Sequence, residues 1–127
     1  MSLVFVLSAI PPSHHGSILR HLFSLVQPGG SLLFRDYARG DLAQKRFESK
    51  EKWREPNLLH KDYDFYRRGD GTMTFFFSEE YVHELSAEIL EAVTETKIEL
   101  VERVGENRKT ATSLRRLFIQ AVWKKRQ

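Results

Sequence analysis

The sequence predicts an α/β fold: a parallel strand–helix–strand unit, then a hairpin, a second helix and a terminal pair of antiparallel strands. Residues 4–7 and 32–34 are continuously apolar, which is typical of strands covered on both faces of a parallel sheet. Apolar residues recur between them at helical spacing: Ile18, Leu19, Leu22, Phe23, Leu25 and Val26. Strand, helix and strand in this order indicate a right-handed crossover.

Turn-forming residues set the expected boundaries of this unit. The first strand is predicted over residues 3–10, because two prolines follow it. Ser13 is suited to capping the next helix, and Pro28-Gly29-Gly30 is suited to ending it. The second strand is then expected over residues 31–37.

The rest of the chain is predicted to extend this sheet. Residues 40–64 read as a polar insertion with a short helix at 42–47, inside a single partial domain that spans 1–127. A hairpin is expected around Gly69-Asp70-Gly71, and Asp70 reads as a turn former. Ser78 marks a helix start, with Val82, Leu85 and Ile89 on its inner face. Strands at 98–104 and 117–123 are expected to pair antiparallel, with Leu117, Ile119, Ala121 and Trp123 on one face.

Composition narrows the class of protein. A chain of 127 residues is long enough for one small domain, and 41% hydrophobic residues suffice for a core. No cysteine is present, which excludes disulfides and thiolate metal sites and permits an intracellular setting. The net charge of +3 and the pI near 9.3 mildly favour a polyanionic partner.

Membrane and metal partners are not expected. The longest apolar run, residues 3–10, is far too short to span a bilayer. His14 and His15 are adjacent, and the other histidines are scattered without the spacing of a helical ligand pair. We expect a cytoplasmic protein, with a nuclear or mitochondrial location as the alternative.

Four segments of the chain carry a resemblance to one known family. They are Leu3 to Ile10, Pro28-Gly29-Gly30 leading to Leu33-Phe34-Arg35-Asp36-Tyr37, Arg68 to Thr72 leading to Phe76-Phe77, and Asn107-Arg108-Lys109 leading to Arg116 and Phe118-Ile119-Gln120. The sequences beginning FVLSAI and FRDY and the RGDGT turn are fairly specific in combination. In this order, the segments resemble the methyltransferase-like proteins that form 3-methylcytidine in tRNA, and the resemblance runs from Leu3 to about Lys124. Ala38 stands where the family has glycine after FRDY.

The resemblance implies the C-terminal half of a class I, Rossmann-like methyltransferase sheet. Residues 4–10 would be its fourth strand, residues 31–37 its fifth, and the last two predicted strands would complete it. The implied cofactor is S-adenosyl-L-methionine, and the implied substrate is tRNA. No loop of the form GxGxG occurs in the chain, so most of the cofactor pocket is expected to be absent and the isolated chain to be inactive.

Candidate cofactor residues follow from the resemblance. In open α/β sheets, ligands bind beyond the carboxyl ends of the strands. In the family fold, the backbone around Val4, Phe5, Leu7 and Ser8 would pack beside the adenine and sulfonium end of the cofactor. The alternative is that this strand is only core.

Candidate catalytic residues end the second strand. N3 of cytosine lies on the Watson–Crick edge, so the base must be unpaired before it can be methylated. Asp36 could accept a hydrogen bond from the exocyclic amine, and Tyr37 could stack on the base. Arg35 completes this group, and the alternative for Arg35 and Asp36 is a structural ion pair at the strand end.

Several basic residues are candidates for binding the RNA backbone, because phosphate contacts need cations and little geometry. A solvated surface is the alternative for each of them. The candidates are His14, Arg46, Arg67, Arg68, Lys109 and Arg116.

Rival functions remain open at this point. One is a non-catalytic RNA-binding or assembly module with the same fold, and another is a small-molecule methyltransferase. The first strand is expected to expose an apolar edge that could pair with a second copy of the chain, giving a homodimer through residues 3–10.

Overall fold

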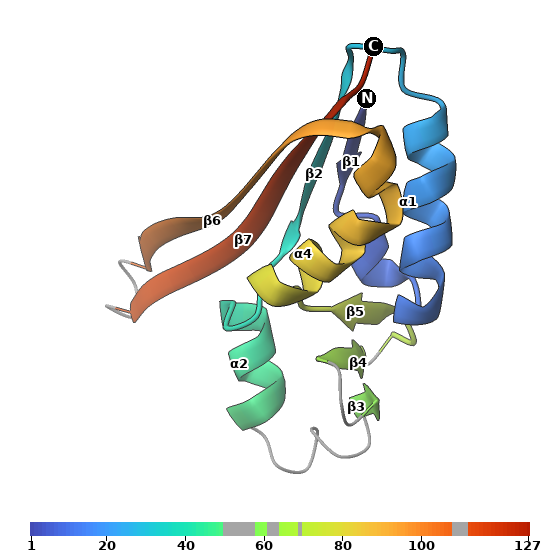
Figure 1. The fold of residues 1–127 in the computed structure, drawn as a ribbon. Helices are drawn as coiled ribbons and strands as arrows, with labels where there is room; N and C mark the ends of the chain where they lie inside the picture. The colour runs from blue at the N-terminus through green and yellow to red at the C-terminus, as the bar shows by residue number, and fades with distance from the viewer. Residues whose placement is uncertain (50–57, 61–63, 69, 108–111) are drawn as a thin grey trace.

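A computed structural model describes residues 1–49, 58–60, 64–68, 70–107 and 112–127. The main sheet has the strand order β1-β2-β7-β6. Its strands are β1 (Ser2–Val4), β2 (Ser31–Tyr37), β6 (Val93–Asn107) and β7 (Thr112–Lys125). β1 pairs parallel with β2, whereas β7 pairs antiparallel with both β2 and β6 (Figure 1). The predicted α/β fold is confirmed, and it is consistent with part of a Rossmann-like methyltransferase sheet.

The helices of the core lie against one face of this sheet (Figure 1). They are α1 (His15–Ser24), α4 (Glu79–Ser86) and the 3₁₀ turn η3 (Ala87–Ala92). Ser78 caps α4 as predicted, because its hydroxyl accepts a hydrogen bond from the Tyr81 N–H at 3.0 Å. The sheet side chains that these helices cover are fully buried: Leu32, Phe34, Ile119, Ala121 and Trp123.

A smaller antiparallel sheet lies at the lower end of the molecule in Figure 1. It contains β3 (Leu58–His60), β4 (Phe65–Arg67) and β5 (Met73–Phe75), and the helix α2 (Leu42–Ser49) precedes it. The predicted hairpin is confirmed. Asp70 forms the turn by accepting hydrogen bonds from the Thr72 N–H and hydroxyl, and Gly71 has a φ of 89°.

The prediction of a strand over residues 3–10 is wrong. β1 ends at Val4, Phe5 has a left-handed φ of 54°, and Leu7–Ala9 forms the 3₁₀ turn η1. Apolar character alone predicted the long strand. The extended backbone ends at Phe5, and the Ser8 N–H, which an eight-residue strand would need for its ladder, is instead bound by the carboxylate of Asp36.

Other boundaries also differ from the predictions. Ser13 does not cap α1, because the 3₁₀ turn η2 (Pro12–His14) comes first and His14 occupies the cap position. The hairpin strand β5 ends at Phe75, and Phe77, beyond it, forms a parallel bridge with Ala38. The last two strands are longer than predicted and extend as an arm beyond the body (Figure 1).

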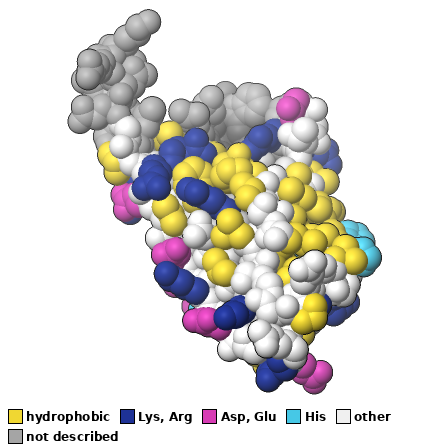
Figure 2. All heavy atoms as spheres, turned by 90° about the horizontal axis from the view of Figure 1, so that it is seen from above, with side chains coloured by type: hydrophobic (Ala, Val, Ile, Leu, Met, Phe, Trp, Pro, Cys, Tyr) yellow, Lys and Arg dark blue, Asp and Glu magenta, His cyan; other side chains and the backbone are white. Residues whose placement is uncertain are grey.

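The second face of the main sheet carries no helix in the described part of the chain. Side chains alternate along strands, so Leu33, Arg35 and Tyr37 of β2 and Phe118 of β7 point to this side. We call it the open face. Hydrophobic atoms also reach the surface at the end where the chain termini lie, with Lys and Arg set around them (Figure 2); Met1 is 54% exposed.

Candidate nucleic-acid interface

Three aromatic rings meet on the open face, where β1 and β2 end. The ring of Phe5 lies 4.9 Å from that of Tyr37 and 5.6 Å from that of Phe118. The Tyr37 and Phe118 rings are 6.3 Å apart. Their place follows from the register, because Tyr37 pairs with Phe118 across β2 and β7. We call these three residues the aromatic cluster.

Guanidinium groups surround the aromatic cluster. Arg35 lies 5.2 Å over the Phe118 ring, and Arg116 lies within 6 Å of both Tyr37 and Phe118. Arg68, from the loop after β4, lies 6.0 Å over the Tyr37 ring. Such cation–π contacts hold the arginines in place while part of each guanidinium stays available.

One arginine atom lacks a hydrogen-bond partner. The Nε of Arg35 is buried and has no partner among the described residues. A buried N–H without a partner is costly, so an anion that reached it would be bound with a favourable free energy.

The orientation of Arg116 is fixed from below by a fully buried carboxylate. Oδ1 of Asp41 accepts hydrogen bonds from the Arg116 Nε at 2.9 Å and from the Leu117 N–H at 2.7 Å. Oδ2 accepts from the Ala43 N–H at 3.1 Å, so Asp41 also caps α2. The cap and the ion pair together lock the start of α2 onto β7.

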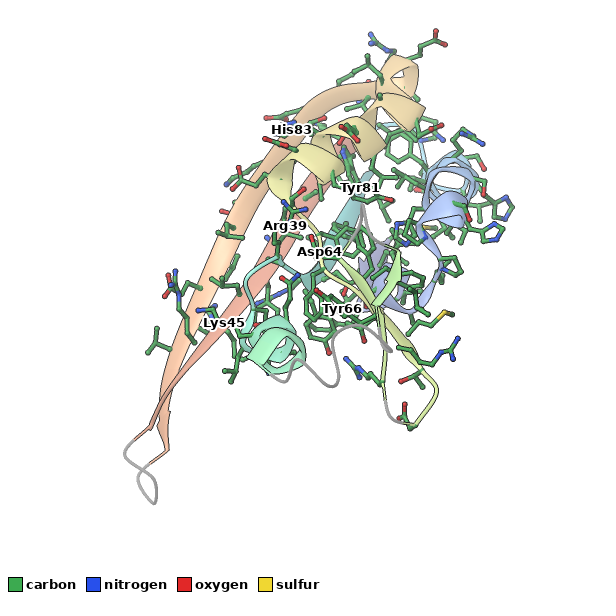
Figure 3. The ribbon with its side chains drawn as sticks, turned by 90° about the horizontal axis from the view of Figure 1, so that it is seen from below. Arg39, Lys45, Asp64, Tyr66, Tyr81 and His83 are labelled. Carbon is green, nitrogen blue, oxygen red and sulfur yellow. The ribbon has the colours of Figure 1, made fainter. Side chains whose placement is uncertain are left out.

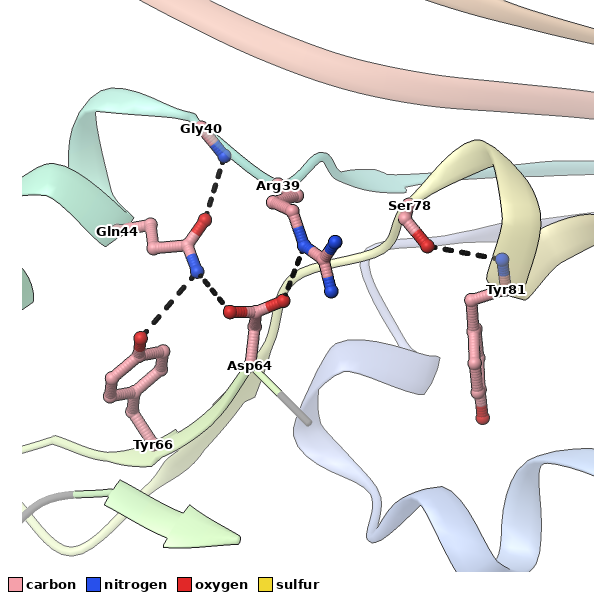
Figure 4. Close-up of polar contacts among 7 residues, drawn as sticks. All are labelled: Arg39, Gly40, Gln44, Asp64, Tyr66, Ser78 and Tyr81. Carbon is pink, nitrogen blue, oxygen red and sulfur yellow. Dashed lines mark hydrogen bonds and ion pairs between the residues drawn. The ribbon is translucent and has the colours of Figure 1, made fainter. Parts of the chain in front are cut away.

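A second polar network joins α2 to the hairpin (Figure 4). Gln44 accepts from the Gly40 N–H at 2.7 Å and donates to Asp64 at 2.8 Å and, more weakly, to Tyr66 at 3.5 Å. Arg39 donates to the other Asp64 oxygen at 2.5 Å. Figure 3 shows Asp64 and Tyr66 between α2 and the hairpin, with Arg39 beside Asp64. This network braces the segment that carries Arg68.

Asp36 does not lie beside Arg35. The two residues are neighbours on a strand, so their side chains point to opposite faces, and the ion pair considered from the sequence is wrong. Asp36 is fully buried and accepts from the Ser8 N–H at 3.0 Å and the Tyr37 N–H at 2.8 Å. Burial raises the pKa of its carboxyl group to about 6.

The candidate cofactor residues divide into two groups. Val4 and Phe5 are each 41% exposed, so the interpretation of this segment as core alone does not hold for them. Leu7 and Ser8 are buried, and the Leu7 side chain belongs to the hydrophobic core. A ligand at this edge could meet Leu7 only through its backbone.

Some of the predicted RNA-binding residues lie together at the aromatic cluster, and others lie away from it. Arg68 and Arg116 join Arg35 at the aromatic cluster. His14 and Arg67 are exposed, and no described contact connects them to it. Lys109 and the side chain of Arg46 lie outside what the structure describes.

Sequence reasoning missed three residues of this region. Phe118 could have been found, because the predicted alternation that turns Leu117 inward also turns Phe118 outward. Asp41, three residues before Gln44, has the spacing of a capping box. No sequence pattern around His15 indicated that its ring is buried, yet the ring is fully buried and hydrogen-bonded.

Two features are missing from the described residues. They contain no group of three or more His, Cys, Asp or Glu side chains placed to hold a metal ion. None of the helices in those same ranges has the length and apolar content needed to cross a bilayer.

Comparison with known proteins gives several relatives that match nearly the whole of this chain. The tRNA N(3)-methylcytidine methyltransferase trm141 of Schizosaccharomyces pombe is 37% identical over 126 residues, which are 98% of this chain and 48% of the relative. Mettl2 of Drosophila melanogaster is 41% identical over 97% of this chain and 35% of its own length. This chain is similar to part of the tRNA 3-methylcytidine methyltransferases.

A mammalian relative gives the same result. The tRNA N(3)-cytidine methyltransferase METTL6 of Mus musculus is 34% identical over 98% of this chain and 41% of its own length. No family model matches the sequence. The chain thus spans less than half the length of these curated relatives, whereas they match nearly all of it.

Proposed function

We propose that this chain is the C-terminal part of a SAM-dependent methyltransferase that forms 3-methylcytidine in tRNA, and that its open face binds the RNA. The observation that carries the proposal is the aromatic cluster, with Arg35, Arg68 and Arg116 around it, at the carboxyl ends of β1 and β2. Unpaired bases stack on aromatic rings, and guanidinium groups bind phosphates. The cluster supplies both kinds of group.

The chemistry needs positioning more than acid–base catalysis. N3 of neutral cytosine has a free lone pair, so its methylation requires no general base. The protein must instead hold an unpaired base in line with the methyl donor. Phe5 and Tyr37 are placed to stack on such a base. Asp36 could reach the exocyclic amine only if η1 moved, because the carboxylate is buried beneath it.

The end of β1 would form one side of the cofactor site. When bound, S-adenosyl-L-methionine supplies the methyl group. The exposed apolar surface of Val4 and Phe5 fits one side of an adenine-sized pocket. Because the sequence has no GxGxG loop, we expect calorimetric titration of the cofactor into this chain to give no detectable heat.

A second candidate function is a non-catalytic RNA-binding module. The same cluster favours it, since stacking and phosphate binding need no cofactor. The two are distinguished by restoring the matching upstream half of a relative. Methyl transfer to tRNA by the restored protein supports the enzyme, and RNA binding without methyl transfer supports the module.

The proposed test measures binding of a fluorescent single-stranded RNA that contains cytidine. Arg116→Gln removes a cation of the open face, and Arg20→Gln removes one from the opposite side, where Arg20 pairs with Glu88. We expect binding that weakens with salt, and a slope of log K against log salt that falls by roughly 0.7 in Arg116→Gln only. Equal effects of both variants would contradict the assignment of the open face.

Two further properties belong to the same proposal. We place the protein in the cytoplasm, in keeping with an RNA substrate. The free edge of β1 (Ser2–Val4) offers a second copy of the chain a short strand to pair with, although it is much shorter than the strand predicted from the sequence. Light scattering tests the homodimer, and a monomer at high concentration contradicts it.

A further inference from the structure

The turn η1 (Leu7–Ala9) is held from one side by a buried histidine. The His15 ring is fully buried, and its Nε2 lies 2.7 Å from the Leu7 carbonyl and 2.8 Å from the Ile10 carbonyl. Its Nδ1 lies 2.7 Å from the Tyr81 hydroxyl on α4. Carbonyls only accept, so Nε2 carries the proton and donates to both of them.

The protonation state of His15 follows from these partners. With the proton on Nε2, Nδ1 of the neutral ring accepts the Tyr81 hydroxyl proton. Burial lowers the pKa of His15, which agrees with a neutral ring. The ring packs between aromatic side chains, with its centroid 5.2 Å from Phe75 and 5.5 Å from Phe77, so it has little room to turn.

A buried carboxylate holds the same turn from the other side. Oδ2 of Asp36 accepts from the Ser8 N–H at 3.0 Å, and Oδ1 is occupied by the Tyr37 N–H. His15 thus binds the Leu7 carbonyl in the turn and the Ile10 carbonyl just after it, and Asp36 binds the Ser8 N–H. These two side chains come from α1 and β2, so the turn is fixed to both elements.

The held turn explains the strained residue before it. Phe5 has a φ of 54°, a left-handed conformation that is costly for a residue with a Cβ atom. Such a conformation persists only where the surroundings determine it. The Phe5 N–H bonds to the Arg35 carbonyl at 2.9 Å, and η1 is fixed from residue 7 onward. The segment of Phe5 and Val6 is thus fixed on one side by the hydrogen bond to Arg35 and on the other by the turn η1.

We propose that His15 and Asp36 are positioning residues that hold η1 so that the Phe5 ring lies in the aromatic cluster and faces the RNA. The proposal rests on the RNA-binding function proposed above. Neither residue touches the ligand. His15 acts from the covered side of the sheet on a ring of the open face, through the carbonyls of Leu7 and Ile10.

The test compares two His15 variants with a control. His15→Leu removes the donor, whereas His15→Gln places an amide N–H where Nε2 stood. Leu85→Ala is the control, because it opens the core on the buried face of α4 and removes none of the hydrogen bonds from His15 and Asp36 to η1 and Ile10. For each variant we would measure unfolding by denaturant, amide hydrogen exchange at Phe5 and Ser8, and affinity for the single-stranded RNA.

The expected results separate positioning from general loss of stability. His15→Leu should speed exchange at Phe5 and Ser8 by at least about tenfold relative to β7 amides, because local opening there no longer breaks the His15 hydrogen bonds. It should weaken RNA binding about tenfold by displacing one stacking ring. His15→Gln should restore both, and Leu85→Ala should change neither.

Two outcomes would overturn the proposal. One is unchanged exchange at Phe5 and Ser8 in a folded His15→Leu variant. The other is an equal loss of RNA affinity in Leu85→Ala. If the wild-type chain binds no RNA, the proposed function fails on its own, and the exchange data still decide whether His15 holds Phe5. The two failures are therefore distinguishable.

Discussion

The two faces of the main sheet differ although the same strands form both. On the covered face, Phe34, Ile119 and Trp123 are fully buried beneath α1, α4 and η3. On the open face, Arg35 and Phe118 remain partly exposed. Because alternate residues point to opposite sides, stability and the proposed binding function reside on neighbouring positions. Adjacent substitutions can therefore separate them.

The largest effect is expected at the centre of the covered face. Trp123→Ala removes a ring that packs on Phe34 and donates to the Ser86 hydroxyl at 2.9 Å, so it should lower the free energy of unfolding by about 3–5 kcal/mol. Val122→Ala, next in the chain on the open face, should cost about 1 kcal/mol. Urea denaturation measures both, and equal losses would mean that the two faces are not distinct.

The next effect comes from Asp36, the one acidic side chain of β2, which points to the covered face. Its pKa rises from 3.8 in the unfolded chain to about 6 when folded, so the folded state binds the proton more tightly. Its contribution to the free energy of unfolding is therefore fully present below pH 3.8 and is lost as the pH rises to about 6. The free energy of unfolding should fall by at most about 1.4 kcal/mol per pH unit through this group.

Asp36→Asn should remove this pH dependence. Denaturant titrations of both proteins between about pH 4 and pH 7 measure it, with the difference between wild type and variant as the readout. The variant should itself be less stable, because an amide offers one acceptor where Ser8 and Tyr37 present two N–H groups. Parallel pH profiles for the two proteins would show that another group titrates.

The pair Phe118 and Ile119 should separate the effect on RNA binding from the effect on stability. Phe118→Ala should weaken binding of single-stranded RNA by about 1–3 kcal/mol, because it removes a stacking ring. Ile119→Ala should cost about 2–5 kcal/mol of stability and leave the affinity of the folded fraction unchanged. The reverse pattern would assign binding to the covered face.

The smallest effect concerns a helix that covers the sheet. Ser78→Ala removes the acceptor of the Tyr81 N–H at the start of α4 and should cost about 1 kcal/mol. Thermal unfolding measures it, and Ser17→Ala, an exposed serine near the start of α1, is the control. Both variants should bind RNA with the wild-type affinity. A loss of affinity in either variant would mean that α1 or α4 takes part in RNA binding.

The elements that the sequence predicted correctly depend on local patterns. The strand at 31–37 and the start of α4 at Ser78 follow from apolar runs and capping chemistry, which neighbouring residues determine. The inward face of β7 follows from alternation. The same rule, applied to Arg35 and Asp36, would have placed them on opposite faces and excluded the ion pair.

The features that the sequence could not predict depend on distant residues. The turn that follows β1 is bound by Asp36, which lies twenty-eight positions beyond Ser8 and accepts a hydrogen bond from the Ser8 N–H. The burial of His15 depends on Tyr81, sixty-six positions away. The meeting of Phe5, Tyr37 and Phe118 depends on three separate segments of the chain. The sequence singled out Phe5 and Tyr37, but it did not predict that they meet Phe118.

The most direct test of the account is an NMR titration of the isolated chain with a cytidine-containing single-stranded RNA. We predict that the amide resonances of Phe5, Tyr37 and Phe118 shift as the RNA is added, while those of α1 and η3 stay in place. Shifts confined to α1 and η3, or no shift at saturating RNA, would contradict the claim that the open face binds the nucleic acid.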